Sequence, residues 1–332
     1  MDQLYASITG CTQSNILSIT VNESHGSATA NAMFEVIDTT LDIGDYVEIN
    51  LGYTTDHGVV FAGYVKQIEH KIQENTYSIT ANDILIRASD YFIVPSNPDD
   101  SFKRRGISAE DLVREVMAMA GLTSFTYDAT YFTFGINSDV EVKLVSSYDY
   151  SRMIGDYITW TVWADRNGTV HFENRKPYVM TGSTGQPGYV PDVPTSYTIQ
   201  DSNLISFSKF VNEKNLRNKV VVWGADGVYA EASASSPYLP AGFYKTVLLS
   251  APDLIGDVGT AQACANYNLN LLNRLTEGIS ATVLGDHSLT ARTVIKSNVV
   301  SITPHITNNW YVFTAEHNWN RSGYTTNLEL RQ

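Results

Sequence analysis

Apolar and polar residues alternate in short runs along most of the chain. Val47, Ile49 and Leu51 fall on one face of an extended segment with polar neighbours between them, which is the pattern of a half-buried strand. The many Tyr, Val and Thr residues also favour strands. The sequence therefore predicts a mainly β protein, with further strands at 58–68, 77–81, 169–172, 219–223, 299–302, 310–313 and 325–330.

Helical spacing is confined to three segments. Ser108 is a suitable N-cap for a helix near 108–120, and Gly121 is suited to its end. Apolar residues at helical spacing predict a second helix near 149–158 and a longer one near 259–276. The residues at 165–168, Asp-Arg-Asn-Gly, separate two strand patterns, so they predict a hairpin loop with Gly168 at positive φ.

The length of 332 residues allows two or three domains. A Pro- and Asp-rich stretch at 95–100 reads as a linker, and Pro, Gly and small residues predict loops at 177–196 and 224–242. The predicted division has a first β unit, an intervening α/β region with the helices near 108–120 and 149–158, and a second β unit with the helix near 259–276 inserted. These three parts span residues 1–95, 96–200 and 201–332.

One internal similarity links the two ends of the chain. Glu69-His70 is followed by Tyr77, and Glu316-His317 is followed by Tyr324 at the same spacing. Upstream, residues 45–49 and 298–302 share a similar pattern. Two interpretations stay open: a chance similarity between two hairpins, or two copies of one small β-barrel.

Negative charge is concentrated in the first part of the chain. The formal net charge is −13, and residues 1–95 hold 12 acidic and 3 basic residues. Between Glu35 and Asp56 there are six acidic residues and no Lys or Arg. Such a composition argues against a high-affinity nucleic-acid binder, which needs clustered cations to displace phosphate counterions. Most often an acidic run of this kind is a solvated outer face.

Motifs for catalysis or metal binding are absent from the sequence. It holds no P-loop, GxGxxG, GxSxG or HExxH motif, and the seven His show no metal-ligand spacing. Two Cys exclude a disulfide framework and fit a reducing compartment. We therefore predict no enzyme, no catalytic residue, no cofactor and no metal. The sequence shows no signal peptide and no apolar run long enough to span a membrane.

Two other classes of function stay open at this point. A glycosidase needs two carboxylates that face each other across a cleft, and a sequence neither shows nor excludes that arrangement. Exposed aromatic side chains could stack on sugars, so a carbohydrate- or receptor-binding module is the alternative to a structural protein.

Four stretches, in this order along the chain, resemble baseplate hub proteins of long-tailed phages, including the late control protein D group. The first is a Gly-Asp-led strand followed by a Phe-Ala-Gly-Tyr-Val strand, and the second is a helix that ends in Gly-Leu. The third is a Tyr-rich helix that leads into a Trp-containing hairpin, and the fourth is a C-terminal Ala-Glu-His hairpin. They lie at 43–65, 108–122, 148–172 and 315–330; residues 225–260 match no part of the pattern.

The resemblance implies a fold and a role. The family has two tube-type small β-barrels with smaller α/β domains between them. Three copies would give six similar barrels, a ring that could meet a six-fold tail tube on one side and a three-fold spike on the other. The implied function is a structural hub in the virion tail baseplate, assembled in the host cytoplasm, of either a contractile or a non-contractile tail. The implied partners are two further copies, the tail tube protein, a spike or tip protein, the tape measure protein and a baseplate wedge.

The same resemblance gives the acidic run a physical role. A hub would form part of the channel through which DNA leaves, so DNA would pass through it without being bound. Carboxylates on a channel wall repel phosphates, and a wall without fixed cations avoids counterion-release binding. The candidate lumen-facing residues are Asp38, Asp42, Asp45 and Glu48.

Overall fold

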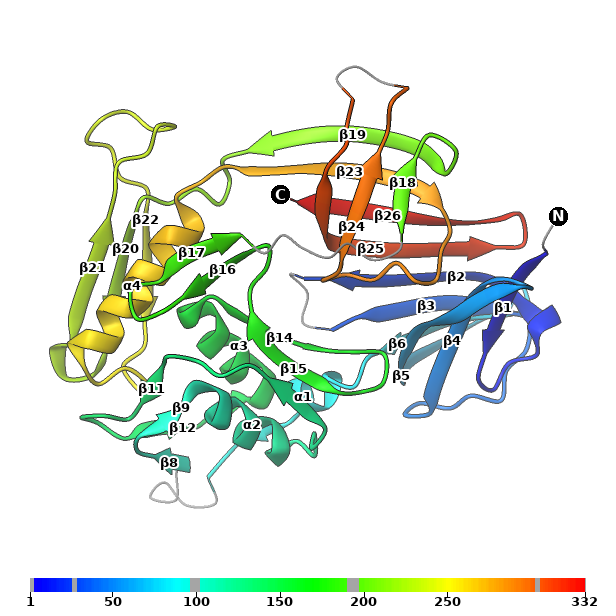
Figure 1. Cartoon of the computed structure of the whole chain (residues 1–332). Helices are drawn as coiled ribbons and strands as arrows, with labels where there is room; N and C mark the ends of the chain where they lie inside the picture. The colour runs from blue at the N-terminus through cyan, green and yellow to red at the C-terminus, as the bar shows by residue number, and fades with distance from the viewer. Residues whose placement is uncertain (1–2, 26–28, 96–101, 190–196, 302–304, 332) are drawn as a thin grey trace.

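The computed structural model describes residues 3–25, 29–95, 102–189, 197–301 and 305–331. Strands account for 48% of the chain and helices for 16%, so the predicted mainly β class is confirmed. Twelve strands form one sheet that is built from both ends of the chain, and the remaining elements pack beside it (Figure 1). Val47, Ile49 and Leu51 are buried on one face of their strand, as the alternation predicted.

The N-terminal half of this sheet consists of six strands that we call the N-terminal β unit. Their order in the sheet is β1-β4-β5-β6-β3-β2. Their bounds are β1 Leu4–Ile8, β2 Ile16–Ser24, β3 Asn31–Val36, β4 Tyr46–Tyr53, β5 Asp56–Lys71 and β6 Thr76–Asn82. The short 3-10 helix η1, Gln13–Asn15, leads into β2.

The other six strands form the C-terminal β unit, and they repeat the same order. Starting from β18, the order of these strands is β18-β24-β25-β26-β23-β19. Each strand has a counterpart in the first unit, although β1 pairs antiparallel with β4 whereas β18 pairs parallel with β24. The bounds are β18 Thr198–Gln200, β19 Leu204–Asn212, β23 Thr276–Leu284, β24 Val294–Asn298, β25 Asn309–Asn320 and β26 Gly323–Arg331.

The common strand order supports an internal repeat, but the sequence motif that suggested it does not align in three dimensions. His70 lies directly opposite Tyr77 in the β5–β6 hairpin. His317 lies opposite Thr326 in the β25–β26 hairpin, because the turn there is two residues shorter: Asn320 pairs with Gly323, whereas Lys71 pairs with Thr76. The repeat is therefore one of topology, and closure of each unit into a barrel stays a prediction.

The two β units are joined by the antiparallel pair β2–β25. The register runs from Ser18 opposite Asn320 to Ser24 opposite Thr314. One edge of β25 pairs first with β24, from Asn309 to Tyr311, and then with β2. The opposite edge of β25 pairs with β26. One long strand thus connects the two units into a continuous sheet (Figure 1).

Two insertions pack together beside the sheet and share one hydrophobic core. The first lies between the two β units and the second lies between β19 and β23, and Leu112, Ile154, Val220 and Cys264 all belong to their common core. The helices are α1 Ile86–Asp90, α2 Ala109–Met119, α3 Ser147–Ile158 and α4 Val258–Leu272, with a 3-10 turn η2 Ala225–Gly227. The main strands are β10 Phe125–Tyr127, β14 Trp160–Ala164, β15 Val170–Asn174, β16 Tyr178–Thr181, β17 Gln186–Tyr189, β20 Lys219–Trp223, β21 Tyr229–Ser233 and β22 Thr246–Ser250.

Six shorter strands complete the first insertion. Five of them lie between Phe92 and Val142, and the sixth leads into α3. Their bounds are β7 Phe92–Ile93, β8 Phe102–Arg104, β9 Ile107–Ser108, β11 Thr133–Phe134, β12 Val140–Val142 and β13 Val145–Ser146.

The three predicted helices are confirmed, with local corrections. Ser108 caps α2 as expected, and Ser146 and Asp257 cap α3 and α4. Helix α4 ends at Leu272, short of the predicted 276, because Thr276 already pairs with Asn212 in the sheet. Helix α1 was not predicted.

Three predicted segments differ in the structure. The predicted strand at 299–302 is wrong over its described part, since Val299 makes only an isolated bridge to Ile306 and the strand is β24 instead. The predicted loops contain strands, because β16 pairs with β17 and β21 pairs with β20. Most of the predicted linker at 95–100, the loop residues 190–196 and Ile302 lie outside the described residues. The predicted domain boundaries stay predictions.

Candidate functional site

The four candidate acidic residues lie on the N-terminal β unit, at and before the start of β4. Asp38, Asp42 and Asp45 are exposed in the segment between β3 and β4, and Glu48 is half-buried on β4. The structure brings Asp42 and Asp45 together, since the backbone N–H of Asp42 donates to Asp45 Oδ2 at 2.8 Å. Glu48 Oε1 accepts from Asn50 Nδ2 at 3.2 Å.

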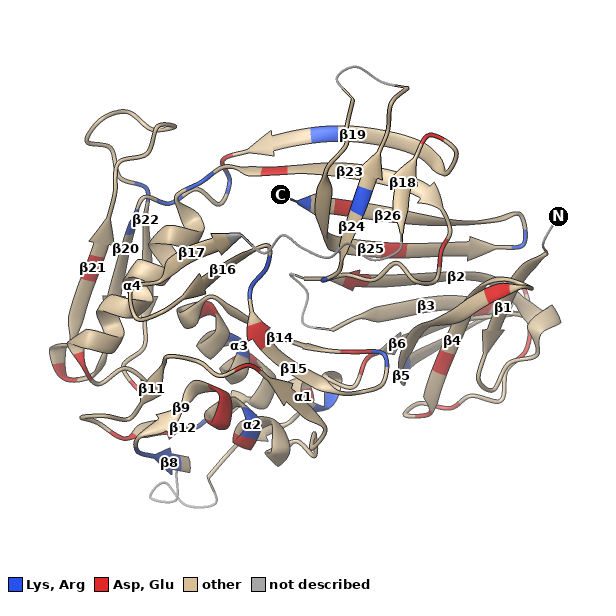
Figure 2. Cartoon of the chain, in the orientation of Figure 1, with Lys and Arg blue, Asp and Glu red and all other residues tan. Residues whose placement is uncertain are grey.

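None of these carboxylates has a basic partner in the described part of the chain. Figure 2 shows acidic segments on the N-terminal β unit, with few basic ones beside them. The arrangement can repel a polyanion, and the direction in which it faces in an assembly stays a prediction.

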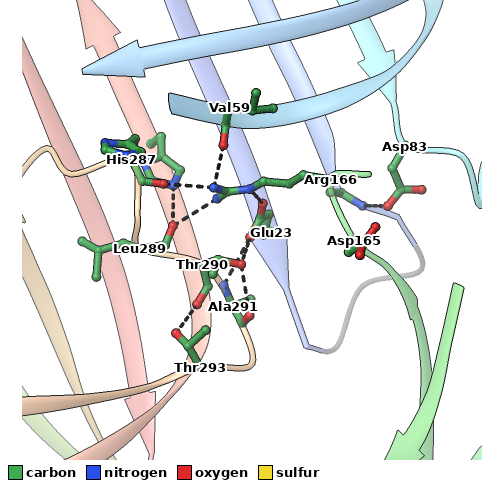
Figure 3. Close-up of polar contacts among 12 residues, drawn as sticks. Glu23, Val59, Asp83, Asp165, Arg166, His287, Leu289, Thr290, Ala291 and Thr293 are labelled. Atoms are coloured by element: carbon green, nitrogen blue, oxygen red, sulfur yellow. Dashed lines mark hydrogen bonds and ion pairs between the residues drawn. The ribbon is translucent and has the colours of Figure 1, made fainter. Parts of the chain in front are cut away.

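A second polar site, which the sequence did not predict, lies where the two β units and the first insertion meet. Arg166 occupies the tip of the β14–β15 hairpin, whose Gly168 has a φ of 78° as expected. Its side chain is 20% exposed, and its guanidinium makes four contacts across the junction (Figure 3). It donates to Glu23 Oε1 at 2.8 Å and to the carbonyl oxygens of Val59 at 2.8 Å, His287 at 2.9 Å and Leu289 at 3.1 Å.

Glu23 completes the contact with the C-terminal β unit. Its second oxygen, Oε2, accepts from Thr290 Oγ1 at 2.8 Å and from the backbone N–H of Ala291 at 3.2 Å. Burial disfavours the charged carboxylate, but Arg166 and these hydrogen bonds outweigh it and lower the pKa of Glu23. We call Glu23, Arg166 and these partners the junction network; it links β2, β5, the β14–β15 hairpin and the β23–β24 connection.

Two buried titratable groups, His317 and Asp83, interact electrostatically with Glu23 of the junction network, and a third, His25, is hydrogen-bonded to Tyr311. His317 Nδ1 accepts from the Tyr324 hydroxyl at 2.7 Å and Nε2–H donates to the Leu289 carbonyl at 2.9 Å, which assigns the neutral Nε2–H tautomer. Burial, followed by the nearby Arg166, lowers the pKa of His317 to about 4. Burial lowers the pKa of His25 and raises that of Asp83 to about 7.

A cavity of about 430 Å³ lies between the insertions and the sheet, and its lining carries an excess of positive charge. The acids of the lining are Asp156 and Glu277. Burial lowers the pKa of Arg274 to about 10, and its guanidinium lies 3.5 Å from the centroid of the Tyr178 ring. Because basic side chains outnumber acidic ones in its lining, the cavity suits an anionic group. The basic residues of the lining are Arg152, Arg175, Lys176, Arg217, Arg274 and Arg331.

The described residues hold no group of three or more His, Cys, Asp or Glu side chains placed to bind a metal ion. Burial raises the pKa of the Cys264 thiol, which favours its unreactive protonated form. Within the described ranges, no helix is long and apolar enough to cross a membrane.

The fold is that of phage tail proteins and related secretion components. The chain is similar over 99% of its length to the tail protein from Neisseria meningitidis MC58, with a TM-score of 0.69, 12% identity and 97% of that chain covered. It is similar to the 43 kDa tail protein of prophage MuSo2 from Shewanella oneidensis, with a TM-score of 0.66, 10% identity and coverage of 99% of this chain and 98% of that one.

A secretion component shares the same fold. An E. coli protein that is described as a component of the type VI secretion system, similar to T4 bacteriophage tail proteins, matches with a TM-score of 0.57 and 8% identity. That match covers 98% of this chain and 76% of the other. No family model and no curated protein matches the sequence, so the likeness rests on the fold.

Proposed function

We propose that the chain is a structural hub of a phage tail baseplate, of the late control protein D type, and that it has no enzymatic activity. One observation carries the proposal: each chain contains two β units with the same strand order, joined edge to edge in one sheet. The fold shared with tail proteins supports the location in a virion tail.

The repeat gives the hub its mechanism. A homotrimer would present six similar β units, so it could dock on a six-fold tail tube with all six and on a three-fold spike or tip protein through the insertions. The tape measure protein and a baseplate wedge would meet the same ring. The central opening would be part of the DNA exit channel, lined by Asp38, Asp42, Asp45 and Glu48, so that DNA passes without binding.

Native mass spectrometry of the purified chain tests the proposal. A species at three times the chain mass of 36.7 kDa is expected, and electron microscopy of that species should show a ring with an open centre. A ring with a basic pore would overturn the role of the four acidic residues. A chain that stays monomeric, alone and with tail tube protein, would overturn the hub.

A second candidate is a carbohydrate- or receptor-binding module of a tail. The loop between β21 and β22 favours it, since Tyr238, Phe243 and Tyr244 are all exposed there and could stack on sugar rings. A glycan-binding screen distinguishes the two: the module should bind a glycan as a monomer and lose binding in Tyr244→Ala, whereas the hub should bind none.

A further inference from the structure

The basic cavity between the insertions and the sheet holds more positive charge than its own acids can pair. Asp156 is shared by two of the basic residues, since its carboxylate lies 2.7 Å from the guanidinium of Arg175 and 3.8 Å from that of Arg152. Glu277, the other acid, pairs at 3.8 Å with Lys209, which is not part of the lining. Both acids of the lining are therefore already engaged.

Two arginines of the lining are held next to each other by the backbone. The N–H groups of Arg217 and Arg274 both donate to the carbonyl oxygen of Leu272, at 3.0 and 2.9 Å. Arg217 lies between β19 and β20 and Arg274 lies between α4 and β23, so the connections into and out of the second insertion meet here. Figure 2 shows basic segments at these connections. Anchoring to one carbonyl fixes both arginines at the cavity.

Neither arginine has a carboxylate partner within the described residues. Nη1 of Arg217 donates to the backbone carbonyls of Lys214 at 3.2 Å and Leu216 at 2.8 Å, and the described part of the chain supplies no acceptor for its Nε and Nη2. The guanidinium of Arg274 stacks on Tyr178 without an acceptor from the described residues. Burial lowers the pKa of Arg274 because a desolvated cation is costly, and an anion in the cavity would offset that cost.

A buried histidine adds an unpaired hydrogen-bonding atom to the same lining. His25 lines the cavity and is 8% exposed. Its Nδ1 lies 2.8 Å from the hydroxyl of Tyr311, whereas its Nε2 has no hydrogen-bond partner within the described residues. Since the Tyr311 hydroxyl finds its acceptor in Nδ1, the hydrogen of the neutral ring is on Nε2. A buried donor of this kind is uncommon in proteins, and a ligand oxygen would satisfy it.

The rest of the lining is largely apolar and sets the kind of ligand. The cavity volume of about 430 Å³ is within the range of small-molecule sites. A small inorganic anion would pair with the arginines but would leave the apolar walls in contact with water. A carboxylate on an apolar body fits both parts, because planar guanidinium groups bind its oxygens and the walls cover its body. The apolar and aromatic residues of the lining include Trp160, Val162, Tyr178, Val247, Leu271 and Phe313.

We propose that this cavity is a binding site for a carboxylate at the end of an apolar group, either a free organic acid or the C-terminus of a peptide. Arg274 and Arg217 pair with the carboxylate, and the Nε2–H of His25 is a further donor. Val247 and Leu271 contact the apolar body. Since the lining includes residues of α3, α4, β23, β25 and β26, a bound ligand joins both insertions to the C-terminal β unit. The inference goes beyond the proposed hub and does not depend on it.

Titrations followed by ligand-observed NMR test the chemistry of the site. The probes are hydrocinnamate, its neutral amide and inorganic phosphate. We expect hydrocinnamate to bind at least about 10-fold more tightly than the amide, because the amide makes no charge-assisted hydrogen bond. Phosphate should displace hydrocinnamate only weakly. Equal affinity for the acid and the amide, tighter binding of phosphate, or no saturable binding of hydrocinnamate overturns the proposal.

A peptide separates the two sources of the carboxylate. Acetyl-Ala-Phe with a free C-terminus carries the same aromatic acid on a peptide backbone. Tighter binding than hydrocinnamate assigns the site to a peptide C-terminus, and equal or weaker binding assigns it to a free acid. Amidation of the peptide should abolish the difference, because it removes the charge that the arginines bind.

Arg274→Met distinguishes a ligand site from an arginine that holds the fold. Methionine keeps the apolar stem and removes the charge, so the affinity for hydrocinnamate should fall at least about 10-fold. Without ligand the variant should unfold at an unchanged or higher temperature, since an unpaired buried cation is gone. Arg105→Met, at a residue that is 70% exposed and pairs with Asp139, should bind as the wild type does. Unchanged affinity in Arg274→Met, or a much lower unfolding temperature without ligand, overturns the proposal.

Discussion

Glu23 and Arg166 lie 143 residues apart in the sequence, and their side chains form a salt bridge of 2.8 Å at the centre of the molecule. The pair is desolvated: Glu23 is 9% exposed and Arg166 is 20% exposed. Since Arg166 also binds carbonyls of both β units, one hairpin tip fixes how the two units meet. If the repeat forms a ring, this contact sets the angle between successive units.

Arg166→Ala should strongly destabilise the protein. The substitution leaves the Glu23 carboxylate buried without its cation and removes one donor from each of three carbonyl groups, of which Leu289 keeps the N–H of His317. Breaking a buried ion pair in this way costs about 3–5 kcal/mol. The free energy of unfolding from urea titration measures the loss. Arg166→Lys should recover only part of it, because an ammonium group does not reproduce the planar fork that reaches four oxygens.

The exposed pair Arg105–Asp139 provides the matched control. Its atoms also lie 2.8 Å apart, but the side chains are 70% and 46% exposed. Because water screens such a pair, Arg105→Ala should cost less than about 1 kcal/mol. Equal losses for Arg105→Ala and Arg166→Ala would contradict the role of burial at the junction.

His317 should make the protein less stable in mild acid. Its pKa in the folded state is about 4, below the ordinary value of 6.5, so the unfolded chain takes up a proton in this range that the folded chain refuses. Stability therefore falls as the pH drops from about 6.5 to about 4, by up to about 3 kcal/mol from this group. The lowered pKa of His25 also reduces stability as the pH drops. The raised pKa of Asp83 has the opposite effect on stability.

The variant His317→Gln isolates this contribution. Glutamine can still donate to the Leu289 carbonyl but does not titrate, so the pH dependence of the unfolding free energy between 4 and 6.5 should flatten. His305→Gln changes an exposed histidine and should keep the full slope. An unchanged slope in His317→Gln would show that other groups control acid sensitivity.

The caps of α2 and α3 predict a smaller, local effect. Ser146 Oγ accepts from the Asp149 backbone N–H at 3.0 Å and donates to its carboxylate at 2.7 Å, and Ser108 does the same with Asp111. Ser146→Ala should cost about 1–2 kcal/mol of stability, since the cap is buried and one N–H loses its acceptor. Ser124→Ala, at an exposed position, should stay within about 0.5 kcal/mol by thermal unfolding.

Local patterns were sufficient to predict the fold class and the three longer helices, but not strands such as β1, β2 and β3. The alternation around Val47 and Ile49, the run at 219–223 and the cap at Ser108 are all set by neighbours in sequence, and the structure confirms them. Periodicity is reliable here because each segment has one buried face. The end of α4 was missed because Thr276, just after the helix, pairs in the sheet with Asn212, which is distant in sequence.

The junction network could not be predicted from the sequence. Arg166 looked like an ordinary residue of a polar hairpin loop, and three of its four partners are backbone carbonyls, which carry no side-chain signal. The β2–β25 pairing likewise joins segments almost 300 residues apart. The Glu-His motif pointed to the repeat, yet His70 is exposed and His317 is buried, so the motif reflects the shared hairpin and not a shared site.

The last prediction concerns the four acidic residues and the path of DNA. If Asp38, Asp42, Asp45 and Glu48 line the channel, their replacement by Lys should turn a repelling wall into a binding one, with affinity that falls steeply with salt. Linear duplex DNA should bind to the assembled variant, whereas the same duplex with streptavidin bound at both ends should not, because a blocked duplex cannot thread a closed ring. Fluorescence anisotropy across a salt series measures both. Equal binding of open and blocked duplexes would place these residues on the outer surface, and wild-type oligomer, which should bind neither, provides the baseline.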